Sequence, residues 1–334
     1  MKKIYLFAVS FLIGIALLAV VIKFVGWGEI RKSLLIFTGF RGLIIFLLTL
    51  LWTLIINWKW KEILKTRGEN IAFFDLFKSF LAGFSVLYLL PTFVLGGEFL
   101  RGYILKKKYS VSWSKGMASV FIDRIIDWTT NLAIVFLGMS FFLFKTGILP
   151  KKIAIAVGFT FFLWLIFMLF FYTMAFRKES IAKLLLKIFS LGNIKIGLLD
   201  MEKEMFEFFN IRKISFWKIL GIALLEEVVL LLRIYTLLIF LGKKIGFLVT
   251  LSISGFYYLS TMIPIPASLG IQDGVQAFAF GALGLGAGVG TAFTLIIRTA
   301  ELLIALIGIA FLFRLGIKIF EDALFKEDNR EIAE

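Results

Sequence analysis

Long runs of apolar residues, separated by short clusters of lysine and arginine, dominate the chain. The 334 residues are 60% hydrophobic, whereas an average soluble protein is about 45–50% apolar. The apolar positions form continuous runs instead of stripes at helical spacing. This pattern predicts an all-α, polytopic membrane helical bundle. We expect about six full spans, at residues 4–22, 43–57, 116–144, 153–174, 219–241 and 290–313.

Two further apolar stretches are short and interrupted by proline. The first covers residues 76–105 and breaks at Pro91, and the second begins at Phe247 and breaks at Pro264 and Pro266. A helix needs about 20 residues to cross a bilayer. Each stretch therefore predicts a re-entrant helical hairpin, which enters and leaves the membrane on the same face.

The positive charges distinguish re-entry from full crossing. If both hairpins re-enter and the N-terminus is inside, the inside loops hold 24 lysine and arginine residues and the outside loops hold 9. Full crossing would place 15 inside and 18 outside, which the positive-inside rule disfavours. We therefore expect a multi-pass protein of the cell membrane with cytoplasmic N- and C-termini.

This topology describes one transmembrane domain, residues 1–320, followed by a charged tail at 321–334. The halves, about 1–145 and 146–320, form an inverted repeat because the second half starts on the opposite side of the membrane. Residues 176–217 are basic and amphipathic, which predicts cytoplasmic helices lying at the membrane surface.

Tryptophans near the ends of the predicted spans are typical of the aromatic belt at a membrane surface. The belt positions are Trp27, Trp58, Trp60, Trp113 and Trp217. Lys59 stands between two of these tryptophans, and we interpret it as marking the inner edge of its span.

Both halves contain the same order of polar residues within apolar surroundings. Glu98 precedes Arg124 by 26 residues, and Asp273 precedes Arg298 by 25. Each arginine has an acid three residues later, at Asp127 and at Glu301. Because positions i and i+3 share a helix face, both arginine–acid pairs are expected to meet. The repeated order indicates two diverged copies of one unit.

Ionisable residues inside a membrane cost about 2.5–3.5 kcal/mol each on insertion scales, so they must be paired or face water. Arg233 lies two turns from Glu226, on the same side of its predicted helix. We expect the arginines to hold a phosphate and the acids to balance them or bind protons. The alternative is that these charges only lock the two halves together. The candidate pathway residues are Gly96, Gly97, Glu98, Arg101, Asp123, Arg124, Asp127, Glu226, Glu227, Arg233, Pro264, Pro266, Gly270, Asp273, Arg298 and Glu301.

Composition narrows the chemistry further. The chain has no cysteine and no histidine, which excludes disulfides, thiol nucleophiles and histidine acid–base catalysis. We expect no cofactor and no metal site. The net charge of +15 lies mostly in loops beside apolar runs, which favours contact with anionic lipid over nucleic acid. The glycine-rich run at 281–290 indicates close helix packing and no nucleotide site.

Three segments resemble a known family. LLPTFVLGGEFLRGYIL, ASVFIDRIIDW and IPIPASLGIQDG, together with Arg298, are similar to the transmembrane region of lysylphosphatidylglycerol synthases, over about residues 4–313. The same region occurs in stand-alone, flippase-like membrane proteins. Ala267 and Ser268 stand where that family tends to have two glycines, and Asp273 stands where it has glutamate.

The resemblance implies lipid transport. In the bacterial multiple peptide resistance factors, this region moves aminoacylated phosphatidylglycerol between leaflets, while a separate soluble domain attaches the amino acid. The chain ends at Glu334 without such a domain, so we expect translocation and no enzymatic activity. The expected partners are membrane lipids, either an anionic phospholipid or a lipid-linked substrate, with a homo-oligomer or a biosynthetic partner as further possibilities.

Two other functions fit the same residues. A membrane-embedded transferase would use Glu98 or Asp273 as a base, although the sequence has no motif for a nucleotide donor. An accessory scaffold in lipid or glycan biosynthesis would have binding partners and no activity of its own.

Overall fold

The computed structural model describes residues 39–89, 96–147, 151–178, 180, 195–243, 245–262, 268 and 270–331. The secondary structure within these ranges is helical, in agreement with the predicted all-α class. The helices are α3 (Phe40–Thr66), α4 (Phe73–Leu89), α5 (Gly96–Tyr109), α6 (Trp113–Thr146), α7 (Lys151–Arg177), α9 (Lys195–Phe208), α10 (Ile214–Phe240), α11 (Phe247–Thr261), α12 (Ile271–Ala282) and α13 (Ala287–Glu331). The span expected at 4–22 lies outside the described residues, as do Trp27, Pro91, Pro264 and Pro266.

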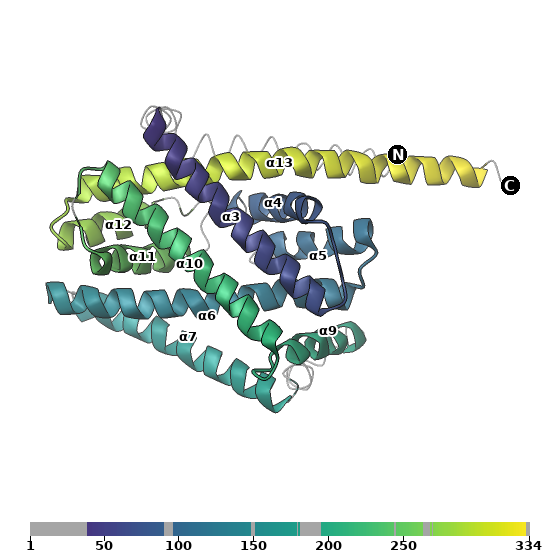
Figure 1. Ribbon diagram of the computed structural model, residues 1–334, viewed down its shortest axis with the longest axis horizontal. Helices are drawn as coiled ribbons and strands as arrows, with labels where there is room; N and C mark the ends of the chain where they lie inside the picture. The colour runs from purple at the N-terminus through teal and green to yellow at the C-terminus, as the bar shows by residue number, and fades with distance from the viewer. Residues whose placement is uncertain are drawn as a thin grey trace.

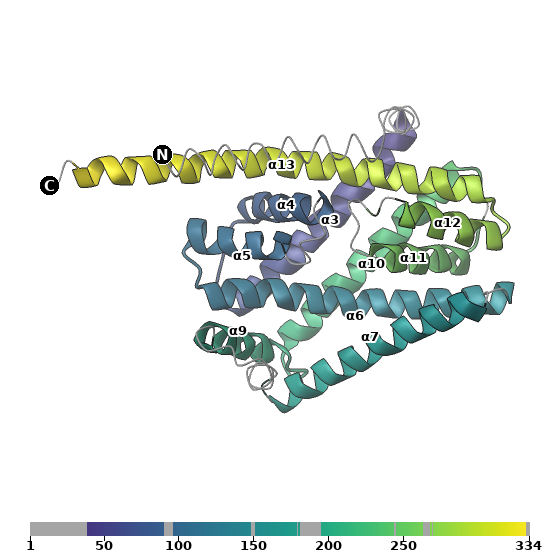
Figure 2. The ribbon, with the colours of Figure 1, turned by 180° about the vertical axis from the view of Figure 1, so that it is seen from behind.

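Two long helices, α6 and α13, enclose the four short ones. Figure 1 shows α4 and α5 at one end of the space between them and α11 and α12 at the other, and Figure 2 shows the same arrangement from behind. Helices α3 and α10 cross this assembly obliquely. Each short-helix pair thus lies against both long helices.

Most of the described helices form two groups, α3 to α6 in the first half of the chain and α10 to α13 in the second. Glycines permit the closest contacts between these two groups of helices. Gly138 of α6 packs against the main chain of Leu251 in α11, and Gly308 of α13 packs against Leu81 in α4. A side chain at either glycine would overlap a carbonyl oxygen of the facing helix. The C-terminal part of each long helix is therefore held by the short helices of the other group.

The N-terminal part of each long helix contacts its own group. Gly116 of α6 faces the carbonyl oxygen of Gly102 in α5, and Gly290 of α13 faces that of Gln276 in α12. Each residue of the first contact stands 174 positions before its counterpart in the second (290 − 116). Since α6 runs from α5 towards α11 and α13 runs from α12 towards α4, the long helices point in opposite directions.

Helices α3 and α10 meet at the centre of the molecule. Ile55 of α3 and Val229 of α10 are buried there in one small apolar cluster with Trp52. These two residues are again 174 positions apart. The two helices therefore cross at residues that correspond to each other at this spacing.

Within the described part of the chain, three helices are long and apolar enough to cross a membrane: α3, α6 and the part of α13 from Ala287 to Arg314. Helices α7 and α10, with 27 residues each, would extend about 40 Å at 1.5 Å per residue. Four charged residues interrupt the apolar sequence of α10. The molecule is a helical bundle with several apolar helices, as expected for a multi-pass membrane protein.

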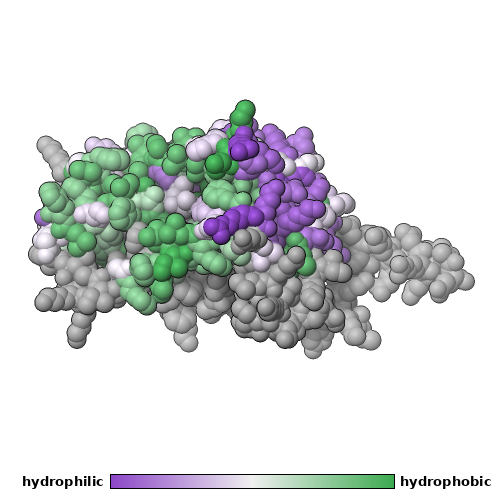
Figure 3. Space-filling model, turned by 90° about the horizontal axis from the view of Figure 1, so that it is seen from below, coloured by the Kyte–Doolittle hydropathy of each residue, from purple (hydrophilic) through white to green (hydrophobic). Residues whose placement is uncertain are grey.

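Apolar side chains are exposed along the outside of the bundle. Helix α7 exposes Phe159 and Phe162, and α10 exposes Leu224 and Val228. In Figure 3 hydrophobic residues cover much of one face, and hydrophilic residues gather towards one end of it. An apolar belt of this kind is a surface that lipid would cover.

Helix α9 lies within the stretch predicted to be amphipathic, 176–217. Its Met205, Phe206 and Phe208 are buried against α6 and α7, whereas Lys203 and Glu207 are exposed. Helix α9 thus has one apolar face, which packs against the bundle, and one charged face. The last helix is longer than expected, because α13 continues to Glu331.

Candidate functional site

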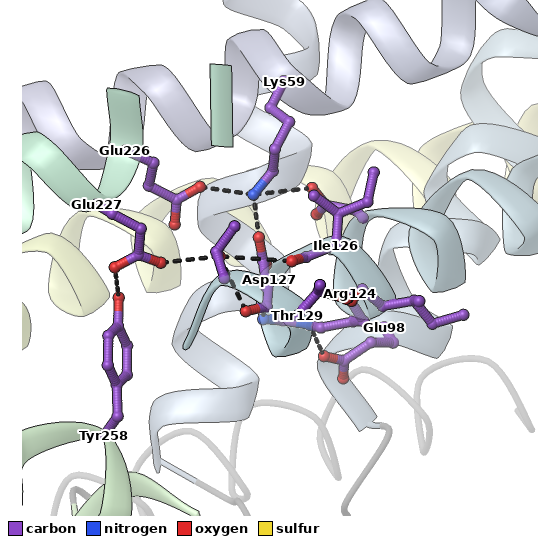
Figure 4. Close-up of polar contacts among 12 residues, drawn as sticks. Lys59, Glu98, Arg124, Ile126, Asp127, Thr129, Glu226, Glu227 and Tyr258 are labelled. Carbon is purple, nitrogen blue, oxygen red and sulfur yellow. Dashed lines mark hydrogen bonds and ion pairs between the residues drawn. The ribbon is translucent and has the colours of Figure 1, made fainter. Parts of the chain in front are cut away.

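A buried lysine lies at the centre of the molecule. Lys59 of α3 is fully buried, and its Nζ contacts the carboxylates of Asp123, Asp127 and Glu226. The Nζ atom is 3.5 Å from Asp123 Oδ1 and 2.5 Å from Glu226 Oε2. Figure 4 shows the ammonium group between the carboxylates of α6 and α10. One side chain therefore links three helices and both halves of the chain.

The sequence-based interpretation of Lys59 as an edge residue is wrong. Lysine between two tryptophans is typical of a membrane surface, but only Trp58 and not Trp60 is exposed here. The indole of Trp60 is completely buried, and its Nε1 donates to Ser119. Lys59 could have been found from its spacing, because Lys59 and Arg233 stand 174 positions apart, as Arg124 and Arg298 do.

The second cation of this cluster is Arg101 of α5. Its Nη2 donates to Asp123 Oδ2 at 2.9 Å, so Asp123 is shared between Arg101 and Lys59. The guanidinium lies 3.9 Å from the ring centre of Trp60 and 5.4 Å from that of Phe80. Stacking on aromatic rings favours arginine over lysine at such a position.

Arg124 links the start of α5 to the centre of α6. Its Nε donates to Glu98 Oε1 at 2.6 Å, and its Nη1 lies 3.6 Å from Asp127 Oδ2. The expected contact between Arg124 and Asp127, one helical turn apart, is therefore present. About a quarter of the Arg124 side chain is exposed, in contrast to the buried Lys59 and Arg101. This arginine connects the buried charges with the surface of the bundle.

Glu227 is held by neutral donors. Thr130 donates its hydroxyl to Glu227 Oε1 at 2.9 Å, and Tyr258 donates to Oε2 at 2.6 Å. No lysine or arginine forms an ion pair with it within the described ranges. Glu227 thus joins α6, α10 and α11, beside the ion pairs of Glu226 and Asp127 (Figure 4).

A second cluster surrounds Arg233 of α10. Its Nη2 donates to Glu301 of α13 at 3.1 Å, and Tyr257 donates its hydroxyl to the same carboxylate at 2.7 Å. The guanidinium lies 5.1 Å from the ring centre of Trp52 and 3.4 Å from the Thr49 hydroxyl. Glu226, expected on the same side of the helix as Arg233, does not pair with it and binds Lys59 instead.

The expected contact between Arg298 and Glu301 is also wrong, because Arg298 pairs with a different helix. Its Nη2 donates to Asp273 Oδ2 of α12 at 2.8 Å, and the Gly270 N–H donates to the same oxygen at 3.1 Å. Gly270 has a φ of 77°, in the left-handed region that glycine adopts without strain. The conformation of Gly270 lets α12 begin with Asp273 in its first turn.

The predicted pathway residues therefore form two groups. Glu98, Arg101, Asp123, Arg124, Asp127, Glu226 and Glu227 gather around Lys59, whereas Arg233 pairs with Glu301 and Asp273 with Arg298. Gly96 begins α5, and Gly97 packs against the carbonyl of Gly83. Arg124 and Arg298 each bind the acid of their own half. Lys59, Tyr257, Tyr258 and Thr130 also take part in these groups, although none of them was among the predicted pathway residues.

Several buried polar atoms in these groups have no hydrogen-bond partner within the described part of the chain. They include Nε and Nη1 of Arg101, Oε2 of Glu98, Nε of Arg298 and Oδ1 of Asp273. Such atoms are rare in protein interiors, and each retains capacity to bind a polar group. The described residues contain no cluster of three acids suited to a metal ion.

Comparison with known proteins identifies the family. The model of the lysylphosphatidylglycerol synthase TM region matches residues 7–308. The chain belongs to this family. The lysylphosphatidylglycerol synthase TM region thus includes both clusters and both short-helix pairs, and the resemblance found in the sequence is confirmed.

Relatives of this family member occur in archaea. The chain is 23% identical to the UPF0104 membrane protein MJ1595 of Methanocaldococcus jannaschii over 310 residues, which cover 89% of this chain and 90% of the relative. It is 27% identical to the UPF0104 membrane protein PH1989 of Pyrococcus horikoshii over 246 residues, 68% of this chain and 72% of the relative. No solved structure matches it.

Proposed function

We propose that this protein moves a phospholipid, or a lipid with a linked polar headgroup, between the leaflets of the cell membrane. The two groups of helices act as an inverted repeat, with α4–α5 and α11–α12 as re-entrant hairpins and both termini in the cytoplasm. The opposite directions of α6 and α13 and the matched glycine contacts support this arrangement. Inverted repeats with interrupted helices are a recurring design of transporters.

The proposal rests on one observation: each of the two hairpins carries an ion pair to a long helix. In each half an arginine of the long helix binds an acid in the first turn of the second hairpin helix: Arg124 with Glu98, and Arg298 with Asp273. Helix N-termini are favourable sites for anions. A phosphate that displaces one of these carboxylates would find the arginine fork already in place, while the other ion pair holds its hairpin against the long helix.

The charged core also suits a headgroup that crosses an apolar layer. Lys59, Arg101 and Arg124 lie among five carboxylates contributed by α5, α6 and α10. A polar headgroup can exchange one charged partner for another in such a core, which lowers the cost of leaving water. The acyl chains would remain against the exposed apolar surfaces of the bundle.

The test is leaflet exchange in reconstituted vesicles. The purified protein is inserted into vesicles that contain fluorescent phosphatidylglycerol, and a membrane-impermeant quencher reports the fraction in the outer leaflet over time. We expect Arg124→Gln and Arg298→Gln to slow exchange by about tenfold or more, which corresponds to about 1.4 kcal/mol. The matched control is Arg212→Gln, which changes an exposed arginine. Equal rates in all four proteins would refute the proposal.

The same preparation separates the two alternatives. A transferase would convert a radiolabelled lipid-linked donor to product without moving lipid between leaflets. A scaffold would do neither and would instead co-purify with enzymes of lipid or glycan synthesis.

A further inference from the structure

The interface between α5 and α6 contains two crossed ion pairs. Helix α5 contributes Glu98 and Arg101, three residues apart on one face, and α6 contributes the neighbours Asp123 and Arg124. Arg101 binds Asp123 at 2.9 Å, and Glu98 binds Arg124 at 2.6 Å. Two guanidinium groups thus lie in the same helix interface, each bound to an acid of the facing helix.

The corresponding interface in the second half has lost one of these pairs. At a separation of 174 positions, Val275 stands in place of Arg101 and Ile297 in place of Asp123, while Asp273 stands 175 positions after Glu98. Among the described residues, the pair of Asp273 and Arg298 is the one ion pair between α12 and α13. The two halves therefore share a backbone arrangement but differ in the charge that an incoming group would meet.

The pair of residues Gly83 and Arg101 differs in size from the residues at the corresponding positions of the second half. A Cβ atom on Gly83 of α4 would lie 2.5 Å from Cγ of Arg101, so glycine leaves the space that the arginine occupies. In the second half, at the same separation of 174 positions, Tyr257 stands in place of Gly83 and the smaller Val275 in place of Arg101. The tyrosine hydroxyl binds Glu301 and lies near Arg233. The second half thus has a tyrosine hydroxyl and a valine at the two positions where the first half has a glycine and a guanidinium.

Arg101 retains unused hydrogen-bonding capacity. It is 1% exposed, and within the described ranges Nη2 alone of its three guanidinium nitrogens has a hydrogen-bond partner. Arg124, which binds the other acid of this interface, has 24% of its side chain exposed, against 6% for Arg298. The first half therefore offers two arginines, one with free N–H groups and one near the surface.

We propose that the first half alone binds the phosphate of the transported headgroup, with Arg101 and Arg124 as its two ligands, whereas Arg298 and Asp273 form a fixed link. This assignment rests on the proposed function and specifies which half recognises the substrate. Two guanidinium forks suit the charge and geometry of a phosphate. Glu98, which has one oxygen without a partner, would release Arg124 when the phosphate enters.

The test measures binding separately from transport. The full-length protein in detergent is titrated with short-chain phosphatidylglycerol, and the dissociation constant is measured by calorimetry. Loss of a charge-assisted contact should weaken binding by about tenfold or more, so we expect this result for Arg101→Gln. Arg298→Gln should bind within about threefold of wild type, less than the loss of one such contact, while exchanging lipid slowly. Thermal unfolding of each variant checks that it is folded.

A double substitution that exchanges two residues of the first half for those of the second gives a sharper test. The double variant Gly83→Tyr with Arg101→Val gives the first half the residues of the second, and it should lose binding as Arg101→Gln does. Arg101→Lys keeps the charge without the fork and should also bind more weakly; it is the variant to use if the others fail to fold. Wild-type affinity in a folded Arg101→Gln or Arg101→Lys protein would overturn the proposal.

Parallel titrations with phosphatidylglycerol and with inorganic phosphate identify the source of the phosphate. Inorganic phosphate that binds as tightly as phosphatidylglycerol would overturn recognition of a lipid headgroup. Failure of the transport proposal gives a different result, because wild-type protein would then bind phosphatidylglycerol in an Arg101-dependent manner without moving it between leaflets.

Discussion

The two halves of the molecule place a basic residue at the same point of the same helix but surround it differently. Lys59 is residue 20 of α3, and Arg233 is residue 20 of α10. Lys59 meets three carboxylates, whereas Arg233 meets Glu301 and the rings of Trp52 and Tyr257. The first cluster is held together by charge, and the second by one ion pair with aromatic and hydroxyl support.

The comparison shows that similar contacts between helices do not require the same charged residues beside them. The glycine contacts that fix the helices recur in both halves, so the architecture is maintained. The residues between those contacts have diverged towards charge in the first half and towards apolar and aromatic groups in the second. We expect variants to reveal this difference as unequal losses at equivalent positions.

The largest effect is expected at Lys59. Lys59→Met removes the cation shared by Asp123, Asp127 and Glu226, and breaking a buried pair costs about 3–5 kcal/mol. Arg233→Met should cost less, because Glu301 retains the hydroxyl of Tyr257. Equilibrium unfolding in mixed micelles measures both. Equal losses of unfolding free energy in the two variants would contradict the claim that the Lys59 cluster depends more strongly on its cation than the Arg233 cluster does.

The glycine contacts should respond equally in both halves. Gly138→Val and Gly308→Val each force a side chain against a facing carbonyl, and overpacking of this kind costs about 1–3 kcal/mol. The same unfolding measurement applies. Gly221→Val is the control, since a Cβ there meets nothing within 4 Å. A large loss in the control would show that the effect comes from the helix backbone and not from the contact.

The smallest predicted difference concerns the two neighbouring tyrosines. Tyr258→Phe leaves Glu227 without one of its neutral donors, so it should cost about 1–3 kcal/mol. Tyr257→Phe should cost about 0.5–1.5 kcal/mol, because Arg233 still binds Glu301. Unfolding of each single variant measures these costs. A greater loss of unfolding free energy for Tyr257→Phe than for Tyr258→Phe would contradict the conclusion that Glu227 depends more on its tyrosine than Glu301 does.

Much of the fold was accessible from the sequence because long apolar runs leave few alternatives to helices. The runs at 43–57 and 116–144 lie within α3 and α6, and the predicted contact of Arg124 with Asp127 is present. The repeated order of acids and arginines drew attention to Arg124 and Arg298 but did not predict that they bind Glu98 and Asp273. Spacing along one helix failed for Arg233. Its partner comes from α13, and the crossing of helices decides which of several nearby acids it meets.

Lys59, Tyr257 and Tyr258 were missed for a related reason. A lysine beside tryptophan has the local pattern of a membrane edge, and a tyrosine in an apolar run resembles any other large core residue. Their roles depend on side chains that lie 31 to 167 positions away in the sequence. The spacing of 174 positions supplies the missing information for Lys59, because it relates Lys59 to Arg233 as it relates Arg124 to Arg298.

The central claim is that the two halves face opposite sides of the membrane, and labelling of single cysteines tests it most directly. The chain has no native cysteine, so each introduced thiol reports alone. Lys107→Cys, at the end of α5, and Ala287→Cys, at the start of α13, are both exposed positions. In intact cells a membrane-impermeant maleimide should label Ala287→Cys and not Lys107→Cys. Labelling of both, or of Lys107→Cys alone, would contradict the inverted arrangement.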